Sequence, residues 1–412
     1  MSVGLWVLTC WVGLATLGWL GMYLGVLLKI DSTRRLRRWQ SPRALERETW
    51  PKLSVIVPAR DEAATIEPAL RSLLAADYPD LEIIVVDDRS SDGTGDVARR
   101  VGEGDARLRV LRVETLPAGW LGKVHALERG RELASGELYL FTDADVVFDR
   151  PDMLRRAVGT LEAEKLDQLT LGPEMVAERF WHSVLVNTFT LALLWQLDAE
   201  NVENPEREAF IGVGAFNLVR RSAFEKTEGF EWLRLEIADD MGLGLMLKKS
   251  GARCRPGLAH DDFSVRWYES FGAMVRGLEK NTFPGMSHFK FWRAAAFMIA
   301  WVFVLAGVPA GVLLFFPGLA LAGGDALGAA PWLSWLGIGC AATIALQLVA
   351  ALVISRIHHR PLGALLLHGV GQWLLLYILL RSTWRYYRER GVSWRETRYE
   401  LDELRAHQRV KV

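Results

Sequence analysis

The sequence predicts a membrane-anchored α/β protein with a mostly parallel sheet. In the middle of the chain, short apolar runs rich in β-branched residues alternate with helix-like stretches. Long apolar segments without charged residues lie on both sides of this middle part. Apolar strands that alternate with helices are typical of a parallel sheet covered on both faces. About 20 apolar residues are enough to cross the core of a bilayer.

Charged residues are unevenly distributed along the chain. The 412 residues include 49 basic and 49 acidic side chains, and a net charge of zero argues against a generic nucleic-acid-binding protein. Residues 49–290, however, carry 30 basic and 40 acidic side chains, and the balancing positive charge lies beside the apolar segments. Three scattered cysteines exclude a disulfide-rich scaffold. The composition therefore indicates an acidic domain between basic, membrane-proximal flanks.

Four apolar segments lack Asp, Glu, Lys and Arg, namely residues 3–28, 294–322, 332–354 and 362–380. We interpret residues 1–30 as an uncleaved transmembrane anchor, because no basic stretch precedes the apolar run and a basic linker, residues 31–50, follows it. By the positive-inside rule, this places the middle domain on the cytoplasmic side of the cell's inner membrane.

The fourth apolar segment is unusual for a membrane span, because His368 and Gln372 lie in its middle. A fourth crossing would also place the basic tail, residues 381–412, outside the cell, against the positive-inside rule. We therefore expect a C-terminal membrane region over residues 291–380, in which residues 362–380 form a re-entrant or interfacial segment. The tail is then cytoplasmic and the protein multi-pass.

The middle domain, residues 51–290, has about 240 residues, enough for one full-size α/β core. Its strands are predicted from short apolar runs and its helices from apolar residues at helical spacing. In chain order the expected elements are a strand at Leu53–Val57, a helix over 63–76, a strand at Ile83–Val86, a helix over 124–134 and a strand at Leu138–Phe141.

Polar or acidic residues follow each of these strands. The first strand runs into residues 58–62, the second into Asp87-Asp88 and the third into residues 142–145. In an open α/β sheet, ligands bind outside the carboxyl ends of the strands, so three such clusters predict a ligand site at that edge. Any single pair is explained equally well by a turn or a helix cap.

Asp143 and Asp145 are separated by one residue, so their carboxylates point the same way in extended backbone. Two uncompensated carboxylates repel each other, and a bound cation removes that repulsion. Mg²⁺ and Mn²⁺ take oxygen ligands and also bind phosphate oxygens. The pair therefore predicts a site for Mg²⁺ or Mn²⁺.

Two further acidic pairs have alternative interpretations. Asp87-Asp88 is typical of a turn between a strand and a helix, but it also suits hydrogen bonds to a base or ribose. Asp239-Asp240 precedes a predicted helix over residues 241–250, where the helix dipole alone stabilises carboxylates. The alternative is a catalytic base that faces the metal site. The sequence has neither a GxGxxG fingerprint nor a P-loop.

Five segments match one family in order and spacing: SVIVPARDEA (54–63), IIVVDDRSSDGT (83–94), GWLGKVHALERGRELASGELYLFTDADV (119–146), GVGAFNLVRRSAFEKTEGF (212–230) and ADDMGLGLMLKKSG (238–251). On these segments the chain resembles membrane-bound family 2 glycosyltransferases, whose catalytic domain has the GT-A fold. GWLGK and the later GVSWRETRY (391–399) are similar to the subgroup that acts on lipid-soluble acceptors, such as carotenoid- and hopanoid-associated transferases. A weaker likeness is to ceramide glucosyltransferases.

The resemblance implies how a nucleotide-sugar donor is bound, with a UDP-sugar as the expected donor. Its base and ribose are held by residues at the first two strand ends: Pro58, Ala59, Arg60, Asp61, Glu62, Asp87 and Asp88. The resemblance also implies that Asp143 contacts the diphosphate and, together with Asp145, the metal. Lys123 is expected near the donor.

The resemblance further implies that Asp240 is the general base, with Asp239 beside it, and that Gly212 and Gly214 border the acceptor pocket. In this chain Asp239 replaces the Glu of the family's Glu-Asp pair, a shortening that we expect to be tolerated.

A second departure concerns the Gln-x-x-Arg-Trp signature of processive enzymes, because Phe263 stands at its Gln position. This argues against a processive polysaccharide synthase. Arg276 and Lys280 follow in a helix-like stretch, where they either bind the phosphate of the leaving group or lie on a solvated helix face.

We therefore expect an inverting, metal-dependent transfer of a sugar from a nucleotide-diphosphate sugar to a membrane lipid or isoprenoid-type acceptor. The alternatives within the same class are transfer to polyprenyl phosphate and processive polysaccharide synthesis. A nucleotidyltransferase would show a Gly-rich basic loop after the first strand, which is absent. A membrane scaffold with a vestigial nucleotide fold is disfavoured by the presence of Asp88, Asp143, Asp145 and Asp240 together.

Overall fold

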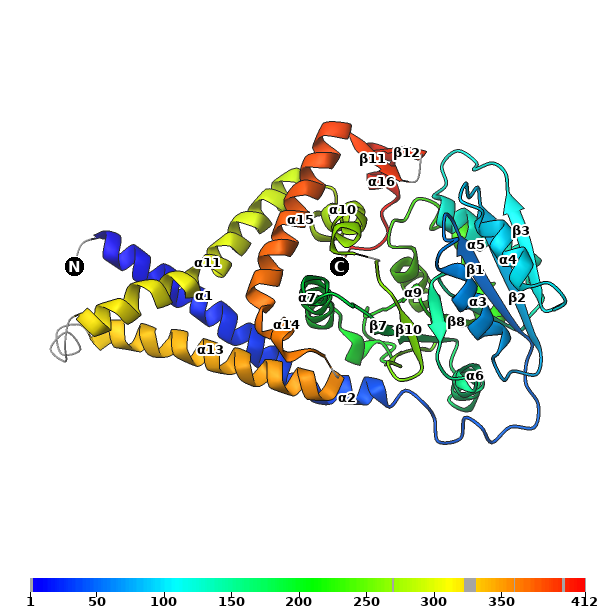
Figure 1. The fold of residues 1–412 in the computed structure, drawn as a ribbon, viewed down its shortest axis with the longest axis horizontal. Helices are drawn as coiled ribbons and strands as arrows, with labels where there is room; N and C mark the ends of the chain where they lie inside the picture. The colour runs from blue at the N-terminus through cyan, green and yellow to red at the C-terminus, as the bar shows by residue number, and fades with distance from the viewer. Residues whose placement is uncertain (1–2, 269, 322–330, 359, 395–396, 412) are drawn as a thin grey trace. The chain divides into compact units, whose positions relative to one another are not determined.

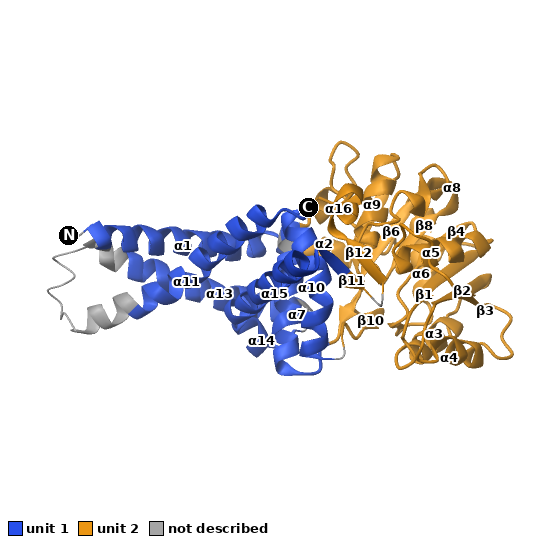
Figure 2. Cartoon of the chain, turned by 90° about the horizontal axis from the view of Figure 1, so that it is seen from above, with its two compact units in different colours: residues 1–31, 177–196, 270–392 blue, residues 32–176, 197–269, 393–412 orange. Residues whose placement is uncertain are grey.

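The computed structural model describes residues 3–268, 270–321, 331–358, 360–394 and 397–411. The chain divides into two compact units, which Figure 2 shows in different colours. Unit 1 contains Met1–Asp31, Ala177–Gln196 and Ser270–Val392, and unit 2 contains Ser32–Val176, Leu197–Glu269 and Ser393–Val412. Each unit is thus assembled from three separate stretches of chain.

Unit 2 is built around a seven-stranded sheet with the order β3-β2-β1-β4-β8-β6-β9. The strands are β1 (Leu53–Ala59), β2 (Leu81–Asp88), β3 (Leu108–Val113), β4 (Leu138–Phe141), β6 (Gln168–Gly172), β8 (Asn217–Arg220) and β9 (Cys254–Leu258). Neighbouring strands run parallel except where β8 pairs with β4 and β6. This confirms the predicted mostly parallel α/β fold, and β4 has the predicted bounds.

The strands are buried on both faces, since every residue of β1, β2 and β4 is buried. The helices that follow strands of this sheet are α3 (Ile66–Leu74), α4 (Thr94–Val101), α5 (Gly122–Leu133) and α8 (Arg221–Phe224), and α9 (Asp239–Lys249) precedes β9. Unit 2 also contains α6 (Met153–Ala163) and α16 (Leu401–His407). Helix α3 buries Ile66, Leu70 and Leu73 at helical spacing. The helices expected over 63–76, 124–134 and 241–250 are therefore present as α3, α5 and α9.

Two smaller sheets were not predicted. The three-stranded sheet contains β5 (Val146–Phe148), β10 (Phe263–Val265) and β7 (Glu174–Met175), and β11 (Gly391–Trp394) pairs with β12 (Thr397–Glu400). Strand β5 begins directly after Asp145, so the smaller sheet fixes the chain that leaves the predicted metal site. Residues 395 and 396 of the segment GVSWRETRY lie outside the described residues.

Unit 1 is helical (Figure 1). Its helices are α1 (Val3–Leu28), α7 (Phe180–Gln196), α10 (Phe271–Ser287), α11 (Phe291–Leu321), α13 (Pro331–His358), α14 (Leu362–Leu366) and α15 (His368–Glu389). Among the described residues, three helices are long and apolar enough to cross a membrane, and they lie in α1, α11 and α13. Residue 322, which ends the predicted segment 294–322, lies outside the described residues. The predicted segment 362–380 forms α14 and the first part of α15 and is not among these candidate spans.

The grouping of the chain differs from the predicted boundaries in two places. Residues 177–196 and 270–290, expected in the soluble domain, pack with the membrane-type helices of unit 1. Residues 393–412, expected as part of a basic tail, belong to unit 2. For residues 177–196 the cause is the composition of α7, which has no Asp, Glu, Lys or Arg and contains an apolar run over Phe180–Leu193.

Candidate active site

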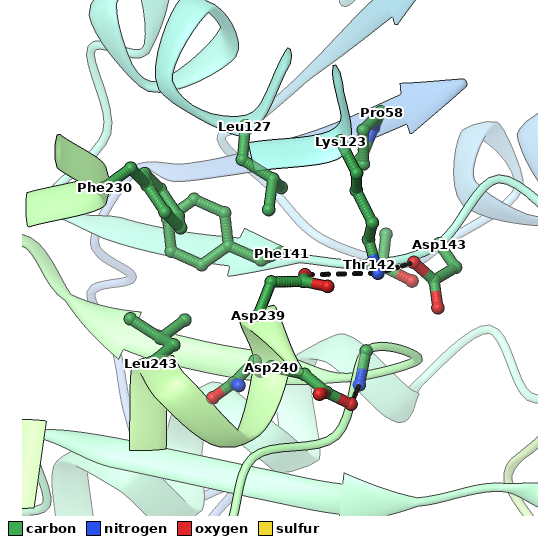
Figure 3. A pocket seen from close by; sticks show the side chains of 12 residues that line it. Pro58, Lys123, Leu127, Phe141, Thr142, Asp143, Phe230, Asp239, Asp240 and Leu243 are labelled. Atoms are coloured by element: carbon green, nitrogen blue, oxygen red, sulfur yellow. Dashed lines mark hydrogen bonds and ion pairs between the residues drawn. The ribbon is translucent and has the colours of Figure 1, made fainter. Parts of the chain in front are cut away.

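A pocket lies at the carboxyl ends of β1 and β4, as the pattern of strand ends predicts. Its walls come from these strand ends, the loop before β8 and the first turns of α5 and α9 (Figure 3). The lining residues are Pro58, Lys123, Leu127, Phe141, Thr142, Asp143, Gly214, Asn217, Phe230, Asp239, Asp240 and Leu243. Segments far apart in sequence therefore bring the predicted Lys123, Asp143, Asp239 and Asp240 together.

Lys123 connects two of the carboxylates in this pocket. Its Nζ lies 2.8 Å from Asp143 Oδ1 and 3.2 Å from Asp239 Oδ2 (Figure 3). Burial alone would lower the pKa of Lys123, but the carboxylates of Asp143, Asp239 and Asp240 raise it well above its usual value. The ammonium group therefore stays charged and offsets part of the negative charge of the pocket.

Asp240 is held in place by backbone amides. Gly214 N donates to its Oδ2 at 3.0 Å and Met241 N donates to its Oδ1 at 2.8 Å. Burial, together with the neighbouring charge of Asp239, raises the pKa of Asp240 to about 6. This carboxylate can take up a proton near neutral pH, as a general base requires.

Gly212 and Gly214 are required by close contacts with the acidic residues. A Cβ added to Gly212 would lie 1.6 Å from the backbone oxygen of Asp240, and one added to Gly214 would lie 2.6 Å from Asp143 Oδ2. Gly214 also accepts a hydrogen bond from Asp143 N at 3.1 Å through its carbonyl. The loop carrying both glycines therefore links Asp143 to Asp240.

Asp145 lies just beyond the pocket, on the segment that enters β5. Burial and the charges of Asp143 and Glu62 raise its pKa to about 7. The same acidic environment, with burial as the larger cause, raises the pKa of Tyr268 to about 12. Ionisation of Asp145 is therefore unfavourable in this environment, and a nearby cation would make it less so. The described residues contain no group of three His, Cys, Asp or Glu arranged to hold a metal.

The predicted donor-binding loop after β1 is braced by the loop after β2. Asp61 N and Glu62 N donate to Ser90 Oγ and Thr94 Oγ1 at 3.0 and 2.8 Å. Asp61 adopts φ +53°, a left-handed conformation that is uncommon outside glycine. The two loops at this edge of the sheet are therefore fixed to each other.

The structure gives Asp87 and Asp88 different environments. The Asp87 carboxylate is fully buried, accepts from Ser90 N at 3.0 Å and lies 2.7 Å from Arg112 Nη1. Its oxygens thus stabilise the loop. The contact of Asp87 with the nucleotide stays a prediction. Asp88 Oδ1 lies 2.7 Å from Arg89 Nε, and its Oδ2 lies 3.8 Å from Arg60 Nη1.

The remaining predicted site residues are placed as follows. Pro58 lines the pocket, and Ala59 is the last residue of β1. Arg276 and Lys280 lie on α10, which belongs to unit 1, and they are not among the described residues that line the pocket. Their contact with a leaving group stays a prediction.

A C-terminal segment, residues 397–411, contacts two of the three chain stretches that carry the pocket's charged residues. The buried carboxylate of Glu236 accepts from Arg409 N at 2.6 Å and Val410 N at 3.0 Å through Oε2, and from Ala238 N at 3.1 Å through Oε1. Sequence reasoning missed this part of the site, because the contacts run through backbone amides that no side-chain pattern reveals.

The other contacts of the C-terminal segment lie near Lys123. The backbone N–H of Gly122 donates a hydrogen bond to the hydroxyl oxygen of Tyr399, which is buried. Arg234 Nη2 lies 3.1 Å from His407 Nε2, and Leu121 N donates to the carbonyl of Arg234 at 2.7 Å. The segment therefore supports both the start of α5 and the loop that leads into α9.

Replacement of Glu236 by Gln is expected to lower both stability and turnover. A Gln side chain has only one acceptor oxygen. Either the N–H groups of Arg409 and Val410 or the N–H group of Ala238 therefore lose their acceptor, which lowers the free energy of unfolding by about 1–3 kcal/mol. Thermal unfolding and steady-state kinetics would measure this, with kcat reduced several-fold and KM for the donor nearly unchanged. Glu231→Gln, which removes an exposed carboxylate from the same loop, is the matched control. A normal kcat in Glu236→Gln would contradict a positioning role.

Comparison with known proteins agrees with this geometry. Residues 54–227 match the sequence model of a protein family that is described as glycosyl transferase family 2. These residues form a family 2 glycosyltransferase domain. The match includes the two loops that are predicted to bind the donor, as well as Lys123, Asp143, Asp145 and the Gly212–Gly214 loop. The family resemblance predicted from the sequence is therefore confirmed.

Curated relatives of the family 2 domain act on lipid-type acceptors, as their names state. The chain is 26% identical over 250 residues to the 4,4'-diaponeurosporenoate glycosyltransferase of Staphylococcus haemolyticus, a match that covers 59% of this chain and 64% of the relative. It is 29% identical over 217 residues to the beta-monoglucosyldiacylglycerol synthase of Trichormus variabilis, covering 50% of this chain and 44% of the relative. The matches thus span less than two thirds of either relative.

A solved structure shares the fold of the family 2 domain and its helices. The mannosyltransferase PcManGT from Pyrobaculum calidifontis, solved in complex with GDP-Man and Mn²⁺, matches with a TM-score of 0.50 and 19% identity. The match covers 92% of this chain and 99% of that protein. The predicted GT-A-type fold with accompanying apolar helices is therefore confirmed.

Proposed function

We propose that the protein transfers a sugar, with inversion at the anomeric carbon, from a nucleotide-diphosphate sugar to a lipid or isoprenoid-type acceptor in a membrane. The observation that carries this proposal is the position of Asp240. Its carboxylate is fixed by two backbone amides in a pocket that also holds Lys123 and Asp143. A buried carboxylate with a raised pKa suits the removal of a proton from an acceptor hydroxyl.

In this mechanism the acceptor hydroxyl attacks the anomeric carbon from the face opposite the leaving nucleoside diphosphate. Asp240 takes the hydroxyl proton as the new glycosidic bond forms and the bond to the diphosphate breaks. Lys123 keeps a positive charge beside Asp143 and Asp239, where it can also contact the departing phosphate. If the acceptor is a polyprenyl phosphate, little deprotonation is needed and Asp240 mainly orients the acceptor.

The residues present fit a divalent cation. Asp143 and Asp145 are separated by one residue, and burial, together with the negative charges of Asp143 and Glu62, raises the pKa of Asp145. We propose that both hold Mg²⁺ or Mn²⁺, with the remaining ligands from the donor's diphosphate. Such an ion would neutralise negative charge that develops on the leaving group.

Two observations support a lipid-type acceptor and a membrane location. Three described helices have the length and composition of membrane spans. Two relatives are named for a carotenoid-type acid and a glycolipid as their substrate or product. Phe263 at the Gln position of the processive signature disfavours polysaccharide synthesis, which we keep as an alternative together with polyprenyl phosphate as acceptor.

The direct test is incubation of membranes that contain the protein with a panel of radiolabelled nucleotide sugars, including UDP- and GDP-sugars, followed by organic extraction. We expect label in the lipid fraction with one donor, its loss on chelation of divalent cations and its return on addition of Mn²⁺ or Mg²⁺. Label confined to insoluble polymer would favour a processive enzyme. Donor binding without transfer to any lipid extract would favour an inactive scaffold.

A further inference from the structure

Helix α15 exposes a row of large apolar and aromatic side chains, which we call the aromatic stripe. Its members recur at intervals of three or four residues and are between 40% and 64% exposed: Val370, Trp373, Tyr377, Leu380, Trp384 and Tyr387. This spacing places them on one face of the helix. The remaining faces are largely buried, with nine buried residues that include Gln372, Leu376 and Tyr386. The helix is thus packed against its own unit on one side and exposes hydrophobic surface on the other.

The packing of the buried side is close. A Cβ on Gly371 would lie 1.9 Å from Thr188 Oγ1 of α7. The buried Ser382 donates to the carbonyl of Glu279 on α10 and accepts from Phe283 N at 3.0 Å. Because α15 is held on this side by other helices of unit 1, the aromatic stripe cannot be the face that belongs to the core.

Contacts within unit 2 require that the chain before residue 270 and the chain after residue 392 lie on the same side of a membrane. The stretches before residue 270 and after residue 392 belong to one folded unit, joined by hydrogen bonds from Arg409 N and Val410 N to Glu236. The chain between them must therefore cross a bilayer an even number of times. Helices α11 and α13 account for two crossings. A third crossing by α15 would place the C-terminal segment on the wrong side for its contacts.

We propose that α15 lies along the membrane–water interface and that its aromatic stripe contacts lipid there. Trp and Tyr are the residues enriched at this level of a bilayer, where an apolar ring meets a polar edge. Amphipathic helices of this kind bury their apolar face about 5–10 Å into the boundary of headgroups and acyl chains. Exposed Arg381 and Arg388 beside the stripe can meet anionic headgroups.

A second copy of the chain is the other candidate to cover the aromatic stripe. Apolar residues spaced three and four apart also form the contact line between two packed helices. The composition favours lipid, since Trp and Tyr make up four of the six members and such contact lines are typically Leu- and Ile-rich. Association of copies through the stripe is therefore an outcome of the test that would overturn the proposal.

The test measures the depth of spin labels in the full-length protein, with its three cysteines replaced by Ala, in bilayers of phosphatidylcholine and phosphatidylglycerol at three to one. Labels are placed at Trp373→Cys and Tyr387→Cys. The matched controls are Ile299→Cys and Leu313→Cys, which have the same sequence separation on α11 and are also exposed. Depth is read from collisions with oxygen and with a water-soluble nickel complex.

We expect the two labels on α15 to lie at similar shallow depths, within about 5 Å of each other. The control labels should differ by up to about 21 Å, at about 1.5 Å per residue. A depth difference on α15 as large as that on α11 would mean that α15 crosses. Full access of both α15 labels to the nickel complex, or spin–spin broadening that disappears on dilution with unlabelled protein, would also overturn the proposal. Val370→Cys and Trp384→Cys repeat the measurement if a first variant does not fold.

Discussion

Replacement of Asp240 by Asn is expected to lower turnover by about 10²–10⁴-fold, the usual contribution of a positioned general base. The Asn amide has a similar shape but cannot take a proton from the acceptor hydroxyl. Donor affinity should change by only a few-fold, because Asp240 lies beside the attacking group in the proposed mechanism. Radiolabel transfer under single-turnover conditions and donor binding by calorimetry measure the two effects separately.

Two controls make this result specific to Asp240. Glu225→Gln removes an exposed carboxylate that pairs with Arg221 and should leave turnover unchanged. Thermal unfolding of Asp240→Asn is also needed, since Gly214 N or Met241 N loses a carboxylate acceptor. Near-normal turnover in a folded Asp240→Asn variant would show that another group is the base, or that none is needed.

Replacement of Lys123 by Met should move the pH dependence of turnover. In the native protein the pKa of Asp240 is about 6, so turnover should fall as the pH drops through that value and the base becomes protonated. Lys123 lowers the pKa of Asp240, because its positive charge favours the ionised carboxylate. Without it, the acidic limb of the profile moves toward neutral pH.

We expect turnover of Lys123→Met at pH 6 to be lower by at least about fivefold, with partial recovery at pH 8. A rise of about one pH unit in the midpoint lowers the ionised fraction of the base at pH 6 from about one half to about one tenth. Lys123→Arg keeps the charge and should retain the native midpoint, though with lower turnover if the larger group fits poorly. If Lys123→Met lowers turnover by the same factor at every pH, Lys123 acts on the donor and does not change the pKa of Asp240.

The sequence predicted the part of the fold that depends on continuous apolar runs. Strands β1, β2 and β4 are such runs and lie at the centre of the sheet. Strand β3 was missed because it is an edge strand in which Arg109 and Arg112 interrupt the apolar pattern. Strand β9 contains Pro256 and Gly257, which are typical of turns. Exposed and edge strands thus carry too little hydrophobic pattern for prediction.

The candidate site was predicted best where several residues form a motif. Lys123, Asp143, Asp239 and Asp240 line one pocket as expected. Asp87 and Asp88 show the limit of this reasoning, because neighbouring residues of a strand point to opposite faces and sequence alone does not say which face the ligand meets. Glu236 was not recognised, since nothing in its local sequence marks a carboxylate that binds distant backbone amides.

The contacts of the C-terminal segment also determine when, during synthesis of the chain, the pocket can be completed. Asp240 leaves the ribosome well before Arg409, and at about 5–20 residues per second the interval is roughly 10–30 s. During that time α11 and α13 are made, and Glu236 has not yet met the amides of Arg409 and Val410. The pocket can therefore be completed only after the membrane helices have been synthesised. A chain truncated within them would leave the charged residues of the pocket without the contacts of the C-terminal segment.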